Sequence, residues 1–198
     1  MALLRTQLRA LACIVVMLTS GSARARADGG PIDVDRSRIT IFVYKSGLFS
    51  ALADNHVVSA RLASGSLSDS APLSVAIVVK ARDLNVVDPD LPAAKRAEVQ
   101  ARMLGPDVLD TATYGDITFT STGVEPAGSA GWKVTGLLTL HGRSKTIVLD
   151  ARREGGACIG SVLIRQRDFG IAPISIAGGA VKVRDELKVT FEIVSHRP

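Results

Sequence analysis

The chain has 198 residues, of which 46% are hydrophobic but only 4% aromatic, and its formal charge is +5. Four of the positive charges come from Arg5, Arg9, Arg24 and Arg26, so the rest of the chain is close to +1 (5 − 4). A chain with so little net charge, and without a cluster of Lys and Arg between aromatic residues, has no feature that supports nucleic-acid binding.

Residues 1–27 are predicted to be a signal peptide that is removed after Ala27 and directs the protein to the periplasm or out of the cell. Arg5 and Arg9 precede a short apolar run from Leu11 to Leu18, and small residues follow this run. The run has about eight residues, far fewer than the roughly 20 that a membrane-spanning helix needs. The mature chain, residues 28–198, is therefore expected to form one domain without a stable membrane span.

Alternating apolar and polar residues predict a series of β-strands along the mature chain. The strands are expected at residues 39–44, 73–80, 117–122, 132–140, 145–151, 158–165 and 187–193. This spacing is typical of an antiparallel sandwich or barrel. The strand at 39–44 is apolar on both faces and needs cover on both sides, which favours a closed barrel of about eight strands.

One amphipathic helix is predicted to interrupt the strands, at residues 90–105. Asp90 can cap its first turn, and the pair Gly105-Pro106 can end it. Its apolar face is expected to consist of Ala94, Ala97, Ala101 and Leu104.

Motifs for reactive chemistry are missing from the sequence. We find no nucleophile motif, no metal-binding motif and no glycine-rich phosphate loop, so no catalytic residue, metal or cofactor is predicted. Cys158 is the one cysteine after the leader, and it is expected to be a small buried hydrophobe. Asp88-Pro89-Asp90 is interpreted as turn and cap residues, because two carboxylates alone do not hold calcium.

Two histidines could act as an acid or a base. His56 and His141 could work with a carboxylate such as Asp54 or Asp150. A structural role is favoured for both, and more strongly for His141, which lies in a tight turn. In a second turn, Arg167-Asp168-Phe169-Gly170, Arg167 and Asp168 are expected to pair at the surface while Phe169 packs inward.

Several short motifs occur in an order that resembles the YceI-like family. The strongest is Leu138-Thr139-Leu140-His141-Gly142, in a turn between two strands. The segments 167–171 and 183–187 provide two further matches. Arg36 and Arg184 stand where the family usually has His and Gly, and the chain departs from the family pattern at these two positions.

The resemblance implies an extended, lipocalin-like antiparallel barrel with an apolar lumen. It also implies a polyisoprenoid or quinone-like partner, a periplasmic or secreted location, and a homodimer. The side chains expected to contact the ligand in the lumen are Phe42, Leu48, Phe49, His56, Met103, Leu104, Phe119 and Phe169.

The leading hypothesis is a lipid-binding protein without enzymatic activity. Burial of each methylene group is worth about 0.8 kcal/mol, so a long chain needs no polar contact to bind. One alternative is a small hydrolase or isomerase with His56 as its base. The other is a solid barrel with a structural or stress-related role at its surface, which a continuous apolar cavity of several hundred Å³ would contradict.

Overall fold

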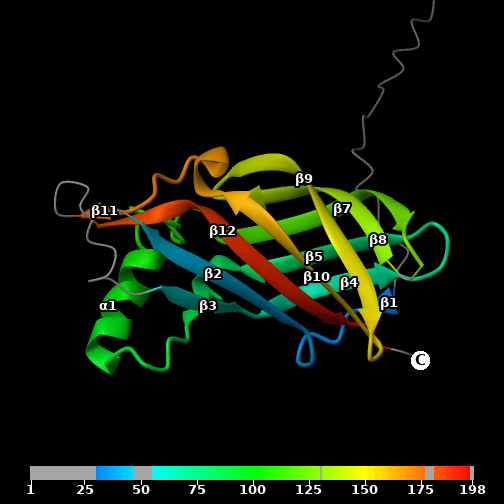
Figure 1. The fold of residues 1–198 in the computed structure, drawn as a ribbon, viewed down its shortest axis with the longest axis horizontal. Helices are drawn as coiled ribbons and strands as arrows, with labels where there is room; N and C mark the ends of the chain where they lie inside the picture. Colours follow the sequence, from blue (N-terminus) through cyan, green and yellow to red (C-terminus); the bar gives the residue numbers. More distant parts are fainter. Residues whose placement is uncertain (1–29, 47–54, 130, 177–180, 197–198) are drawn as a thin grey trace, which may run out of the picture.

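The computed structural model describes residues 30–46, 55–129, 131–176 and 181–196 (Figure 1). The predicted signal peptide and its cleavage site lie outside the described residues. So do three residues singled out above, namely Leu48, Phe49 and Asp54.

One antiparallel sheet curls into an extended half-barrel, as the pattern and the resemblance predicted (Figure 1). Its nine described strands of five or more residues are β2 (Arg38–Ser46), β3 (His56–Ala60), β4 (Leu62–Ser68), β5 (Ser74–Lys80), β7 (Asp116–Ala127), β8 (Gly131–Leu140), β9 (Arg143–Glu154), β10 (Ala157–Arg165) and β12 (Val181–Val194). Three two-residue strands complete it: β1 (Gly30–Pro31), β6 (Asn85–Val86) and β11 (Ser175–Ile176). The strand order is β1-β4-β5-β7-β8-β9-β10-β12-β2-β3-β6, and β11 pairs with β12.

The strand count differs from the expected eight mainly because the alternation pattern did not identify β3 and β4. These two strands are separated only by Arg61, and β4 contains three serines and a glycine, which do not form an apolar face. Each of the seven segments predicted from the pattern coincides with a strand, and only Leu73, which precedes β5, lies outside one.

The single described α-helix, α1 (Ala93–Leu104), covers one end of the barrel, and β1 lies at the other end (Figure 1). Gly105 ends the helix as predicted, but Pro92 and not Asp90 is the N-cap, without a side-chain cap hydrogen bond. Of the predicted apolar face, Leu104 packs on the core as expected, but Ala94, Ala97 and Ala101 are exposed. The helix packs on the core through Val99, Met103 and Leu104, which bury more apolar area than alanine does.

The interior is filled at the β1 end. Ile32, Leu62 and Ile193 are buried together there. Further along, the rings of Phe119 and Phe191 lie where side chains at Gly136 and Gly160 would be. At the same end the Ile32 N–H donates to the Gly65 carbonyl at 3.0 Å, which ties the segment before β2 to β4.

A second core lies at the α1 end, where β3, β5, β8 and β10 meet the loops and α1. It includes Val58, Val79, Leu140 and Ile164, and its most buried side chain is Phe169 in the short 3₁₀ helix η3 (Gln166–Phe169). Another 3₁₀ helix, η2 (Ala81–Asp83), follows β5. No helix of the described residues is long and apolar enough to cross a membrane.

Candidate ligand-binding site

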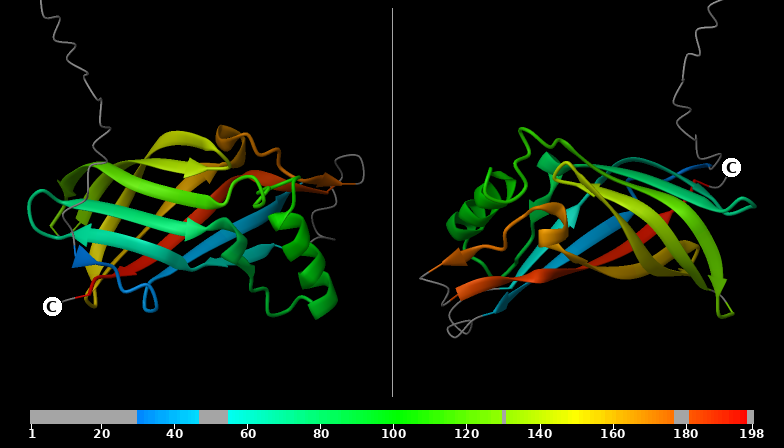
Figure 2. Two further views of the ribbon diagram at one scale, coloured as in Figure 1. Left: turned by 180° about the vertical axis from the view of Figure 1, so that it is seen from behind. Right: turned by 90° about the horizontal axis from the view of Figure 1, so that it is seen from above.

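A cavity of about 720 Å³ lies between α1 and the ends of β2, β3 and β12. Figure 2 shows α1 set off from the sheet at this end of the barrel. Most of the lining is apolar and is contributed by Ile41, Val43, Val58, Leu84, Val86, Leu91, Val99, Met103, Val108, Leu109, Leu140, Ile171, Ile174, Val183 and Leu187. At the α1 end, the described side chains therefore leave part of the lumen unfilled.

The period of two along each strand places these side chains inside the barrel. On β2, Ile41, Val43 and Lys45 form one inward row. On β3, Val58 and His56 form the next row, in register with Ile41 and Val43 respectively. In both rows an apolar residue lies deep in the cavity, and a basic or polar residue follows at the α1 end.

Polar side chains fix α1 beside the cavity. The Gln100 side chain accepts a hydrogen bond from the Val86 N–H and donates one to the Leu84 carbonyl, each at 2.7 Å. The Arg96 guanidinium donates to the Asp88 carbonyl at 2.9 Å. These bonds join the helix to the segment around β6, so α1 forms a wall of the cavity although none of its residues is fully buried.

At the cavity wall, the His56 side chain forms a hydrogen-bonded pair with the carboxylate of Asp88. The His56 Nδ1 lies 2.7 Å from one carboxylate oxygen of Asp88, and the other oxygen accepts the Val57 N–H at 2.6 Å. Because the carboxylate accepts from Nδ1, a neutral His56 imidazole has its unprotonated nitrogen at Nε2. Asp88 is buried. It directly precedes the turn at residues 89–90, and Asp54 lies outside the described residues.

Two of the eight predicted contact residues, His56 and Met103, line the cavity. Leu104 and Phe169 belong to the adjacent core, and Phe119 lies over Gly136 on the inner face of the sheet. The remaining three do not contribute to the described lining: Phe42 is on the outer face of β2, between the inward residues Ile41 and Val43, while Leu48 and Phe49 lie outside the described residues.

His141 has the structural role that was favoured for it. Its backbone has a positive φ of 50°, and Gly142 follows with a φ of 68°. The His141 Nδ1 lies 3.2 Å from the Phe169 carbonyl oxygen, and its ring centroid is 4.3 Å from that of Tyr114. This histidine joins the β8–β9 turn to η3.

Arg167 was expected to pair with Asp168, but Asp185 on β12 is its partner. The Arg167 N–H donates to Asp185 at 2.9 Å, and the guanidinium Nε lies 4.0 Å from the same carboxylate. The inward packing of Phe169 is confirmed, at 1% exposure.

Cys158 packs beside the core at the β1 end as a small hydrophobe, as predicted, but it is half-buried and not fully buried. Burial raises the pKa of the Cys158 thiol, and the positive charge of Arg153 partly offsets this increase.

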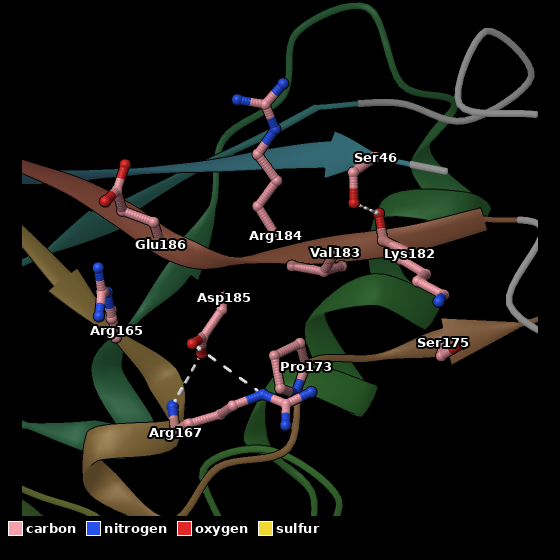
Figure 3. A pocket seen from close by; sticks show the side chains of 10 residues that line it. All are labelled: Ser46, Arg165, Arg167, Pro173, Ser175, Lys182, Val183, Arg184, Asp185 and Glu186. Atoms are coloured by element: carbon pink, nitrogen blue, oxygen red, sulfur yellow. Dashed lines mark hydrogen bonds and ion pairs between the residues drawn. The ribbon is translucent and has the colours of Figure 1, made fainter. Parts of the chain in front are cut away.

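A second, more polar pocket of about 590 Å³ lies outside the barrel wall, between β12 and the segment from η3 to β11 (Figure 3). It shares Lys182 and Val183 with the cavity. Arg184, one of the two departures from the family pattern, lines this pocket and donates from Nε to the Lys45 carbonyl at 3.3 Å. The other, Arg36, pairs with Asp33 at the β1 end and is far from the cavity.

No group of three or more His, Cys, Asp or Glu side chains that could hold a metal ion occurs in the part of the chain that the structure describes.

The fold and the cavity define a class of protein: an antiparallel barrel, closed at one end by packed side chains, with an apolar chamber at the other. The YceI-like domain matches residues 31–195. The chain belongs to the YceI-like family.

Known proteins agree with this assignment. A UPF0312 protein of Vibrio cholerae is 31% identical over 133 residues, which are 61% of this chain and 65% of the relative. A UPF0312 protein of Pseudomonas syringae is 32% identical over 111 residues, 51% of this chain and 56% of the relative. The matched regions thus span less than two-thirds of these relatives' own lengths.

Two solved structures show the same fold. The crystal structure of Burkholderia cenocepacia BcnA matches with a TM-score of 0.61 at 19% identity and covers 83% of this chain and 99% of that one. The YCEI protein of Campylobacter jejuni matches with a TM-score of 0.51 at 21% identity and covers 71% and 82% respectively.

Proposed function

We propose that this protein is a periplasmic or secreted carrier that holds an isoprenoid or a similar long apolar molecule in the cavity beside α1. The observation that carries the proposal is the volume of about 720 Å³ enclosed mainly by aliphatic side chains. Ligand pockets of proteins typically measure about 300–1,000 Å³ and are mostly apolar.

The volume sets the length of chain that fits. The cavity equals about 24 times the roughly 30 Å³ that a water molecule occupies in the liquid. A methylene group is similar in size, so about 20 carbon atoms fit inside and a longer isoprenoid would extend out of the mouth. About ten buried methylene groups contribute about 8 kcal/mol, which is comparable with the roughly 4–15 kcal/mol that association costs in lost freedom. Tight binding thus requires more than about ten carbons, for which the cavity has room.

Native mass spectrometry of the mature protein purified from the periplasm, followed by solvent extraction, tests the proposal. We expect a stoichiometric adduct that extracts as a long apolar molecule. Val99→Trp, which fills the cavity, should abolish the adduct, whereas Ala97→Trp on the exposed side of the same helix should retain it. A clean apo mass, with no uptake of offered isoprenoids, would contradict the proposal. The same spectra test the expected homodimer, and cell fractionation tests the location.

A second candidate function is a hydrolase or isomerase that acts on an apolar substrate. The observation that favours it is the His56–Asp88 pair, which orients an imidazole at the wall of the cavity. A carboxylate that holds a histidine in one tautomer is a common arrangement for a general base. If His56→Ala binds the extracted ligand as the natural protein does, and neither protein converts it, the carrier function holds and the enzymatic one fails.

A further inference from the structure

The wall of the barrel is split between β9 and β10. These two strands pair only next to their shared turn, where residues 150–154 of β9 are in register with residues 157–161 of β10. Residues 143–149 of β9 pair with β8 alone, and residues 162–165 of β10 pair with β12 alone. Among the strands that the structure describes, residues 143–149 therefore have an open side, which we call the β9 edge.

Apolar side chains are left without cover along the β9 edge. The period of two places Ile147 and Leu149 in the inward row of β9, in register with Gly136 and Val134 of β8. Both are only half-buried, and neither belongs to the two cores described above. On the outer face, Val148 is 50% exposed. A further strand on this edge would cover these side chains and pair with the backbone groups that face β10 nearer the turn.

The other half of the β9 edge is cationic. Arg143 and Lys145 continue the inward row, in register with Leu140 and Leu138, yet both are exposed. The Arg143 guanidinium lies against Gly170 at the end of η3. Neither cation forms an ion pair with another described residue, and residues 143–149 contain no acidic side chain. The edge thus has an apolar end and a cationic end.

We propose that the β9 edge is a docking site for an extended segment of a partner protein, with apolar residues opposite Ile147 and Leu149 and acidic residues opposite Lys145. Addition of a strand to an open edge gains main-chain hydrogen bonds, and alternate side chains give the specificity. A second copy of this chain cannot supply the acidic half, because its own β9 edge contains no acid. Lysine on an edge also opposes pairing with a strand that does not compensate its charge.

The position of the edge relates the partner to the cavity. The cationic end begins three residues after Leu140, which lines the cavity. A partner strand would therefore lie next to the chamber. It would bind whatever the cavity holds, so the docking site does not depend on the proposed function.

A fluorescein-labelled peptide, Val-Thr-Val-Thr-Glu-Thr-Glu, tests the site by fluorescence anisotropy. The pairs that β9 forms with β8 and β10 are antiparallel. In the same orientation the valines of the peptide lie opposite Leu149 and Ile147, and its glutamates lie opposite Lys145 and Arg143. The peptide of reversed order has the same composition but places its glutamates at the apolar end. An exposed ion pair changes an affinity by a factor of about 1.4 to 5, so the loss of two pairs should weaken binding about fivefold.

Charge reversal assigns the binding to this edge. Lys145→Glu should weaken binding of the glutamate peptide about fivefold and strengthen that of Val-Thr-Val-Thr-Lys-Thr-Lys. Arg61→Glu makes the same change of charge at an exposed residue between β3 and β4, and it should affect neither peptide.

Three results would overturn the proposal. One is equal binding of the two glutamate peptides, and another is equal binding of the glutamate peptide to the natural protein and to Lys145→Glu. The third is that no peptide binds. In that case, a dimer or an attachment to phosphatidylglycerol vesicles that Lys145→Glu abolishes would identify a second copy or a membrane as the occupant. The carrier function stands in each case, because none of these peptides tests the cavity.

Discussion

Asp88→Ala should destabilise the protein by about 2–4 kcal/mol, although Asp88 is a single side chain in a loop. Its buried carboxylate accepts the Val57 N–H at 2.6 Å and lies 2.7 Å from His56 Nδ1. Truncation leaves both donors without this partner, and an unsatisfied buried donor costs about 1–3 kcal/mol. We take the lower part of that range for each, because both bonds are only partly buried.

Urea unfolding followed by circular dichroism measures this loss as a free energy of unfolding. For a domain of this size, about 3 kcal/mol corresponds to a decrease in Tm of about 6–12 °C. Asp90→Ala is the matched control: it removes an exposed carboxylate two residues further along and should change stability by less than about 0.5 kcal/mol.

Asp88→Asn separates the two hydrogen bonds. The amide oxygen can still accept the Val57 N–H, but the amide N–H₂ then faces His56 Nδ1 and requires the tautomer whose proton is on Nε2. We expect a loss of stability between those of the control and Asp88→Ala. If Asp88→Ala unfolds at the same urea concentration as Asp90→Ala, the carboxylate does not anchor β3 and the reasoning is wrong.

Two further predictions concern the β1 half of the barrel. Gly136→Ala places a methyl group against the Phe119 ring and the Thr120 carbonyl, and it should destabilise the protein by about 1–3 kcal/mol in the same urea assay. Gly123→Ala is the control, because a methyl group there meets open space and should not change stability. Equal effects of the two substitutions would contradict the tight packing at Gly136. Because burial raises the pKa of Cys158, a smaller fraction is thiolate at neutral pH, and alkylation by iodoacetamide should reach its half-maximal rate at a higher pH in the native protein than in urea. Identical pH profiles would show that the thiol is not shielded.

The strands could be predicted because alternation is a local property of the sequence. The alternating apolar residues Leu138 and Leu140 on β8, for example, can be recognised in the sequence without knowing which residues they pack against. The face of β2 that points inward could not be predicted in the same way. Both of its rows are apolar, and a register change of one residue exchanges them.

The size of Phe42 favoured the wrong row. Sheet pairing places Phe42 beside Val57 and Lys188, on the outer face, and Ile41 beside Val58 and Val189, on the inner face. Lys188 is the signal that distinguishes the two rows, but it lies at the far end of the chain and is informative only once the register is known.

The polar part of the site depends on contacts between distant segments. His56 and Asp88 are 32 residues apart, and no local motif relates them. The charged residues that line the cavity likewise come from β2, α1 and β12, which are far apart in the sequence.

The volume and the apolar lining of the cavity together limit what can occupy it. A sealed void of 720 Å³ would cost about 17 kcal/mol at about 24 cal/mol per Å³, more than the roughly 5–15 kcal/mol by which a domain is stable. The space must therefore hold water or a ligand. Water inside it meets mainly aliphatic walls and finds few hydrogen-bond partners, so an apolar chain that displaces this water lowers the free energy of the folded protein. Since Phe119 and Phe191 fill the barrel beyond, such a chain has its end at the mouth, where the exposed lining residues are the charged Lys95, Glu98, Arg102 and Lys182.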